Sequence, residues 1–124
     1  GNPMSQSTFS QDYLKIWTEP DAQQRRANIE SLFAPEGKMV VSSIGKTLTG
    51  IDEIDQHISR VRADVIEDKG MSFSYGQQVD NAEATYLTSL VSNPEGDVVG
   101  RGADVIIRDE DGLISAVYMF MGLN

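Results

Sequence analysis

The sequence has no cysteine and only one histidine among its 124 residues. Without cysteine it has neither a disulfide framework nor a thiol nucleophile. No nucleophilic triad stands out around the single histidine, and no set of residues has the spacing of metal ligands. The sequence therefore predicts no metal and no cofactor.

Basic residues are scarce, with 10 Lys and Arg against 19 Asp and Glu, which gives a formal net charge of -9. Nucleic acids and anionic membranes select clustered Lys and Arg, so this charge argues against both as partners. Long apolar runs are also lacking. The longest, Leu113 to Met121, is interrupted by Ser115 and is too short to span a bilayer.

The N-terminus has no charged segment followed by an apolar run, so a signal peptide is not expected in this sequence. Gly1-Asn2-Pro3 before Met4 resembles an expression scar, and we expect residues 1–7 to be disordered. Residues 8–124 fit one domain that buries roughly two thirds of its unfolded surface. These features favour a cytoplasmic protein, with a signal removed before residue 1 as the alternative.

Three amphipathic helices are predicted from their caps and apolar spacing. The first begins at Thr8 and ends before Pro20. The second begins after Asp21 and ends at Pro35-Glu36-Gly37. The third begins at Thr49 and closes near Gly70. Its apolar residues repeat every three or four positions: Ile51, Ile54, Ile58, Val61 and Val65.

Strands are predicted between and after these helices, over residues 38–44, 47–49, 71–76, 85–92, 99–108 and 113–121. The last two flank an acidic Asp-Gly turn typical of a hairpin. Both carry apolar residues on both faces, so we expect this hairpin in the middle of the sheet with both faces covered. Helices followed by a run of antiparallel strands indicate an α+β fold.

This order resembles the cone-shaped, cystatin-like fold of the nuclear transport factor 2-like (NTF2-like) superfamily, in its SnoaL-like branch of polyketide cyclase relatives. The resemblance covers roughly residues 9–121, and its local matches lie at residues 32–37, 49–54, 102–104 and 109–114. It implies three helices packed in a strongly curved, mostly antiparallel sheet. It also implies an apolar cavity at the wide end of the cone and a homodimer through the convex sheet face.

Tyr13 and Asp104 are the residues that we single out. They match the positions where ketosteroid isomerases, which share this fold, carry the tyrosine and the protonated aspartic acid of their oxyanion hole. A carboxyl group in an apolar cavity stays neutral and can donate a hydrogen bond to a developing enolate. The alternatives are that Asp104 caps, pairs with an arginine or is solvated, and that Tyr13 packs its ring in the core.

Val41 occupies the position where the resemblance would require the isomerase's carboxylate base. An apolar side chain cannot abstract a proton, which argues against proton-shuttling isomerase activity. His57, on the edge of the third helix's apolar stripe, is a candidate general base facing the cavity or a half-exposed surface residue. Trp17, Phe33, Val41 and Ile106 are expected to contact the ligand, with a place in the core as the alternative for Trp17.

The sequence thus favours a SnoaL-like protein that binds a small apolar organic ligand. A cofactor-free cyclase, isomerase or hydratase activity, with Asp104 or His57 as acid or base, is one form of this hypothesis. The alternative is a non-catalytic dimerisation or adaptor module of the NTF2-like fold. A binder keeps an apolar pocket with Tyr13 and Asp104 facing in, whereas an adaptor fills it with side chains.

Overall fold

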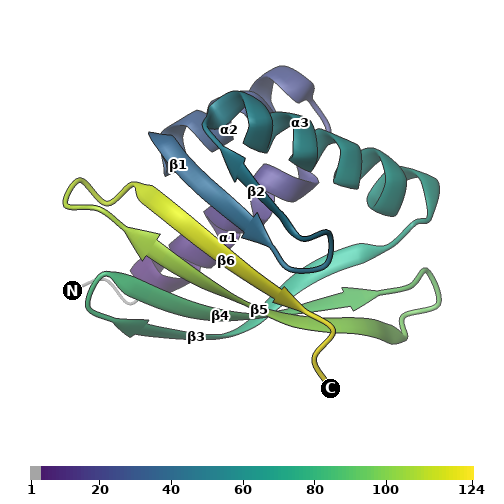
Figure 1. Ribbon diagram of the computed structural model, residues 1–124. Coiled ribbons are helices and arrows are strands. Elements are labelled where there is room, and N and C mark those ends of the chain that lie inside the picture. The colour runs from purple at the N-terminus through teal and green to yellow at the C-terminus, as the bar shows by residue number, and fades with distance from the viewer. Residues whose placement is uncertain (1–3) are drawn as a thin grey trace.

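A computed structural model of the protein shows an α+β fold in which helices lie across one face of a single six-stranded sheet (Figure 1). The structure describes residues 4–124, with side chains described from residue 9 onward. Within this part of the chain, no helix is long and apolar enough to cross a membrane.

The helices are α1 (Met4–Thr18), α2 (Ala22–Leu32) and α3 (Ile51–Val61), and α3 runs on into a π-helical turn, η1 (Arg62–Asp68). The predicted start of the first helix at Thr8 was too late: residues 4–7, expected to be disordered, are helical. The rest of that predicted tail, residues 1–3, lies outside the described residues. Asp21 caps α2 as predicted, since its Oδ2 accepts from the Gln24 amide at 3.2 Å.

The strands are β1 (Phe33–Val41), β2 (Lys46–Thr49), β3 (Ser72–Asn81), β4 (Ala84–Ser92), β5 (Val98–Arg108) and β6 (Ile114–Met121). Their order in the sheet is β2-β1-β6-β5-β4-β3, and every neighbouring pair is antiparallel except β1 with β6. The prediction that the final hairpin lies mid-sheet is confirmed, whereas its second part, that both faces are covered, stays a prediction, since Phe120 of this hairpin is exposed in the single chain. The prediction that α2 continues to Pro35 is wrong, because β1 already begins at Phe33.

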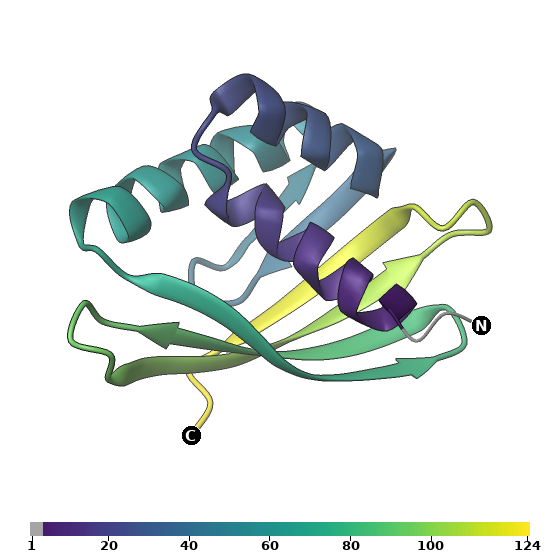
Figure 2. The same cartoon turned by 180° about the vertical axis from the view of Figure 1, so that it is seen from behind.

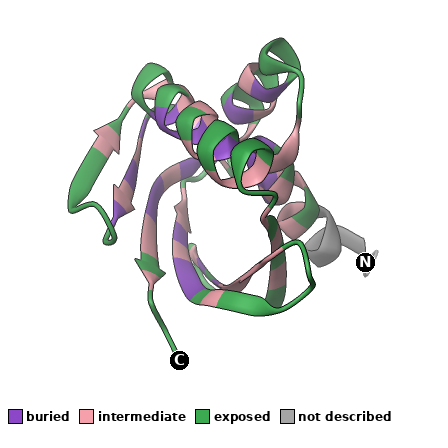
Figure 3. Ribbon diagram, turned by 90° about the vertical axis from the view of Figure 1, so that its right-hand side faces the viewer, coloured by how far each residue is buried: buried purple, intermediate pink, exposed green. Residues whose placement is uncertain are grey.

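The helices cover the concave face of the curved sheet, and α1 crosses in front of that face in Figure 2. Buried residues gather on the inner side of the strands and on the helix faces that meet them (Figure 3). The largest fully buried side chains come from both layers: Tyr13, Ile16, Ile29, Phe33, Met39, Ile54, Ile58, Leu87, Ile106, Ile114 and Val117. No helix of residues 4–124 covers the opposite, convex face of the sheet.

Two arginines fix α1 relative to its surroundings. The Arg108 guanidinium on β5 lies 4.3 Å from the centre of the Phe9 ring on α1 and donates to Thr85 Oγ1 at 2.9 Å. At the other end of α1, the buried Arg62 donates to the Thr18 carbonyl at 3.4 Å. These contacts set where the side chains on the inner face of α1 meet the sheet.

Candidate functional site

Asp104 lies in an inward-facing row of apolar side chains. On β5 it pairs with Leu87 of β4 and Met119 of β6, and Met119 pairs with Val41 of β1. Paired residues in neighbouring strands point to the same side of the sheet. The carboxyl group is therefore held among aliphatic side chains, and the residue is only 1% exposed. The alternative of a solvated Asp104 is therefore wrong.

Tyr13 and Trp17 bring two more polar atoms to the same place. They are four residues apart on α1, so they share one face of the helix, and both residues are buried. Tyr13 OH, Trp17 Nε1 and Asp104 Oδ1 are all buried without a well-formed hydrogen bond among the described residues. The Tyr13 hydroxyl nevertheless lies near enough to Trp17 and Asp104 to interact with both. A buried polar atom without a partner is costly, and this cluster therefore holds hydrogen-bonding capacity that the described residues do not use.

Burial controls the ionisation of this cluster. It raises the pKa of Asp104 to about 7, and the nearby Tyr13 hydroxyl offsets part of that rise. The Tyr13 pKa lies well above its ordinary value because of burial, reinforced by the charge that Asp104 acquires when it ionises. Below about pH 7 the cluster thus offers a phenol, an indole N–H and a neutral carboxylic acid, all of them hydrogen-bond donors.

Tyr75 of β3 is a member of this cluster that the sequence analysis did not single out. Its ring centre lies 5.5 Å from that of Tyr13, and its pKa is raised by burial and then by Asp104. The available signal was the alternation of Met71, Phe73 and Tyr75, which marked one face of the strand as apolar. That alternation places the side chain on the inner face, but not beside a carboxyl group on a strand two positions away.

An apolar pocket of about 280 Å³ opens beside the cluster. Its walls come from α1, the β1–β2 turn, α3, η1 and the inner face of the sheet. The lining residues are Trp17, Val41, Ser43, Ile44, His57, Val61, Val65, Phe73, Tyr75, Ser89, Leu90, Val91, Asp104, Met119 and Met121. Asp104 is the acidic residue of this wall, and Trp17 and Val41, which are predicted ligand contacts, also line it.

Gly102 makes room at the sheet side of this pocket. It pairs with Ser89 and Met121, both of which line the pocket. A Cβ at this position would come within 2.7 Å of Met121 Sδ and the Phe120 carbonyl oxygen, and 3.0 Å of Ser89 Oγ. Glycine therefore permits a close packing here that no other residue allows without movement.

His57 of α3 also faces the pocket. The residue is 8% exposed, and its ring centre lies 6.2 Å from that of Trp17 in an edge-on contact. Burial lowers the His57 pKa, and the nearby cations Arg60 and Lys46 lower it further. The imidazole is therefore neutral near pH 7, and the half-exposed placement considered from the sequence does not hold.

Phe33 and Ile106, expected as ligand contacts, do not line this pocket and belong to the core. The register explains the difference. Ile106 pairs with Val117 and Phe33 with Ile114, so both lie toward the start of β6, whereas the pocket lies toward its end at Met121. Among the residues that the structure describes, no cluster of His, Asp and Glu is suited to hold a metal ion.

No family model and no curated protein matches the sequence. The structure is similar to that of a candidate isomerase of the SnoaL-like family from Agrobacterium tumefaciens, with 25% identity, a TM-score of 0.83 and coverage of 94% of this chain and 97% of that one. A candidate SnoaL-like polyketide cyclase from Jannaschia is 11% identical at a TM-score of 0.66, over 98% and 89% of the two chains.

A steroid delta-isomerase from Pseudomonas aeruginosa is 18% identical at a TM-score of 0.67, over 98% of this chain and 82% of that one. The last two likenesses establish the fold alone, since their identities are low. Each of the three similarities covers at least 94% of this chain. The chain thus belongs, by its fold, to the NTF2-like superfamily, and within it the chain is similar to the SnoaL-like branch.

Proposed function

We propose that this protein binds a small, mostly apolar organic molecule that carries one hydrogen-bond acceptor, such as a carbonyl oxygen. The observation that carries the proposal is the group of three buried, unpartnered polar atoms on Tyr13, Trp17 and Asp104 beside an apolar pocket. A carbonyl oxygen placed there accepts hydrogen bonds that the protein does not make internally. Ligand sites commonly combine apolar walls with a few convergent polar groups in this way.

The size of the pocket supports a small ligand. Its volume of about 280 Å³ is near the lower end of the range of roughly 300–1,000 Å³ that is usual for ligand sites. Two of the similar structures are named for polyketides and for steroids, which are mostly apolar organic molecules. The alternative of a non-catalytic adaptor has less support, because an adaptor would fill this space with side chains.

Catalysis is a second candidate, favoured by His57. Its neutral imidazole lines the same pocket as Asp104 and makes no hydrogen bond among the described residues, so it is free to accept a proton. A ketone held by Tyr13 and Asp104 would be acidified at its α-carbon, and His57 would take that proton while the donors stabilise the enolate oxygen. Val41 cannot serve as this base.

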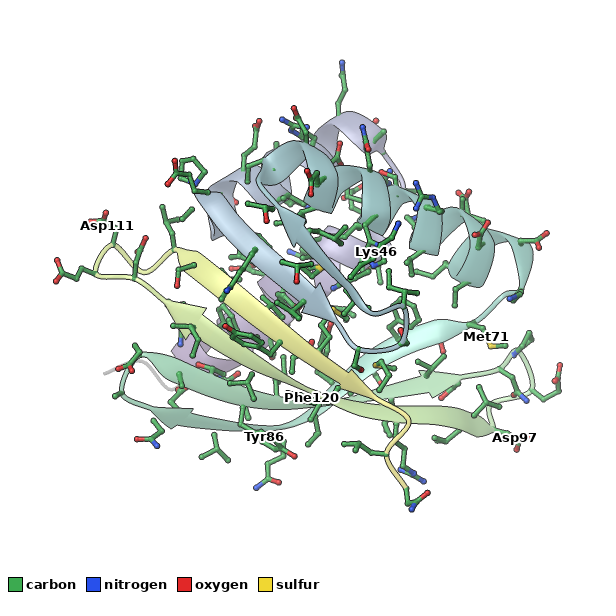
Figure 4. The ribbon with its side chains drawn as sticks, in the orientation of Figure 1. Lys46, Met71, Tyr86, Asp97, Asp111 and Phe120 are labelled. Atoms are coloured by element: carbon green, nitrogen blue, oxygen red, sulfur yellow. The ribbon has the colours of Figure 1, made fainter. Side chains whose placement is uncertain are left out.

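The convex sheet face supports a homodimer. The register joins Val79, Tyr86, Val105, Tyr118 and Val40 into one row across five strands. Figure 4 shows Tyr86 on the side of the sheet away from the helices, and it is 42% exposed. An exposed apolar row in the middle of a sheet is a typical interface, and a second copy of the chain would cover it.

The binding proposal is tested with Trp17, the single tryptophan, as the fluorescent reporter. Cyclohexyl methyl ketone is titrated beside ethylcyclohexane, which has a similar shape and no acceptor. We expect the ketone to bind about tenfold more tightly, the effect of roughly one good hydrogen bond. Tyr13→Phe should remove most of this preference, whereas Tyr86→Phe on the convex face should keep it. Equal affinity for the two probes would contradict the proposal.

Catalysis is tested separately by incubating the ketone with the protein in D₂O and following loss of the α-proton signals by NMR. We expect exchange faster than in buffer and dependent on His57, so that His57→Gln returns it to the buffer rate. If wild-type protein binds the ketone but exchange stays at the buffer rate, the catalytic candidate is wrong and the binding proposal stands.

A further inference from the structure

His57 belongs to two hollows of the structure. It lines the apolar pocket and also a second, polar cleft beside β2 and α3. The other residues of this cleft are Lys46, Thr47, Leu48, Glu53, Gln56 and Arg60. The binding of an apolar ligand does not use this polar cleft. Because the cleft adjoins the pocket at His57, a polar part of a ligand bound in the pocket could lie in the cleft.

The cleft carries a net positive charge, because Glu53 offsets only one of its two cations, Lys46 and Arg60. Lys46 and Arg60 form no ion pair among the described residues, whereas Arg26, Arg62 and Arg108 are each paired with a carboxylate. Lys46 and Arg60 are therefore available to bind an anionic group of a ligand.

The two cations lie close to the imidazole. Arg60 follows His57 by three residues on α3, so the two side chains share one side of the helix. Lys46 begins β2, which packs beside α3 (Figure 4). Both cations are near enough to His57 to act on it electrostatically. Glu53 is the acidic member of the cleft, and its Oε1 accepts from the Thr49 amide at 2.9 Å.

We propose that the natural ligand carries a carboxylate that lies in this cleft against Lys46, Arg60 and the His57 imidazole, while its apolar body occupies the pocket. The inference rests on the proposed function and names its ligand class more closely. Lys46 and Arg60 together with Glu53 leave a net charge of one, which matches a singly charged acid. The ligand is then an apolar oxo-acid, with its ketone at the Asp104 end and its carboxylate at the His57 end, an arrangement that extends the binding proposal and is an alternative to catalysis by His57.

The test uses an oxodecanoate whose ketone lies next to the terminal methyl group, together with its primary amide. The two probes share their apolar body and ketone and differ in charge. With Trp17 fluorescence as the readout, we expect the acid to bind wild-type protein about tenfold more tightly than the amide at low salt. The preference should shrink as salt is added, because Lys46 and Arg60 lie toward solvent.

The variant Lys46→Gln/Arg60→Gln should lose the preference for the acid and keep its affinity for the amide. The matched control is Lys15→Gln, which removes an exposed cation of α1 outside both hollows and should change neither affinity. Equal binding of acid and amide by wild-type protein would overturn this inference while leaving the proposed function in place. Failure of both probes to bind would overturn both.

NMR of the single histidine gives a second readout of the same inference. A carboxylate beside the ring stabilises the imidazolium, so the acid probe should raise the His57 pKa and the amide should not. The charged groups around the ring, Lys46, Arg60 and Glu53, are the same in both measurements. An unchanged His57 pKa at saturating acid probe would place the carboxylate elsewhere and overturn the inference.

Discussion

Asp104 occupies a position where a charge has little support. Its neighbours across the sheet are Leu87 and Met119, and no Lys or Arg forms an ion pair with it among the described residues. Such a carboxyl group is held neutral by burial, which is why its pKa rises to about 7. The same property makes it a hydrogen-bond donor for a ligand and a source of pH-dependent stability.

The first prediction concerns that stability. Since the folded-state pKa of Asp104 is raised above its unfolded value, the folded protein binds more protons than the unfolded chain between about pH 4 and pH 7. The free energy of unfolding should therefore fall as pH rises through this window. At one pKa unit per 1.36 kcal/mol, the Asp104 contribution is at most about 4 kcal/mol.

Asp104→Asn removes this titration while keeping the side chain's size. Denaturant unfolding at pH 5 and pH 8 should show wild-type stability falling relative to that of the variant as the pH is raised. Asp111→Asn, in the exposed β5–β6 turn, is the matched control and should follow wild-type protein. A constant difference between wild-type protein and Asp104→Asn at the two pH values would contradict the prediction.

A second prediction concerns Tyr13, whose nearby hydroxyl partly offsets the rise of the Asp104 pKa. Removing that hydroxyl in Tyr13→Phe should raise the pKa of Asp104 further above 7, because the charged carboxylate loses a stabilising neighbour. Carboxyl-resolved NMR of the variant checks this. An Asp104 pKa that falls, or that does not move, would show that the two groups do not interact.

For single residues, the sequence identified candidate site members where a residue type is unusual among its neighbours. An acid within an apolar strand drew attention to Asp104, and helical spacing brought Tyr13 and Trp17 to one face. Tyr75 was not assigned a role because aromatic residues are ordinary in strands. Its importance comes from the pairing of strands, which places it beside Tyr13 and Asp104.

Among the elements, β5 shapes the pocket most. It does so through its two glycines, Gly100 and Gly102, as much as through Asp104. A methyl group at Gly102 would clash with the Phe120 carbonyl oxygen at 2.7 Å, whereas one at Gly100 would meet Val91 Cβ at an ordinary 3.5 Å. The two glycines lie two residues apart on one strand, so they face the same side of the sheet. They form a matched pair for substitution.

The third prediction is that Gly102→Ala destabilises the protein by about 1–3 kcal/mol, the usual cost of overpacking. Gly100→Ala should change the free energy of unfolding by clearly less. Urea unfolding of the two variants beside wild-type protein measures both values. Equal effects of the two substitutions would show that the close contact at Gly102 yields without cost.

Element boundaries were predicted unevenly. The apolar stripe of α3 and the turn chemistry of the β5–β6 hairpin are local signals, so both elements were found from the sequence. The early start of β1 at Phe33 depends on pairing with Ile114, a contact between distant parts of the chain that no local pattern records. The π-helical turn after α3 has no sequence signal of its own.

For the whole molecule, the fold was predicted because the order of helices and strands is characteristic of it. The parallel pairing of β1 with β6 joins two strands far apart in the chain, so no local pattern of residues could predict it. The convex face of the sheet bears on how the whole molecule associates. Its apolar side chains, which include Tyr86 and Phe120 in Figure 4, have no covering element among the described residues.

The fourth prediction is that the protein is a dimer in solution and that Tyr86→Asp converts it to a monomer. A carboxylate in the centre of the apolar row would be desolvated by the partner, which is costly. Leu123→Asp changes an equally exposed apolar residue near the C-terminus and should leave the dimer intact. Light scattering at micromolar concentration distinguishes these outcomes, and a wild-type monomer would contradict the interface.

The proposed ligand site depends most on the Asp104 carboxyl group being protonated inside the pocket. The direct measurement is the pKa of Asp104 by carboxyl-resolved NMR, with the spectrum of Asp104→Asn used to identify its signal. We expect a midpoint near pH 7. A midpoint near the ordinary aspartate value of about 4 would mean that the group is solvated and ionised, and that it is not the donor on which the proposed ligand site depends.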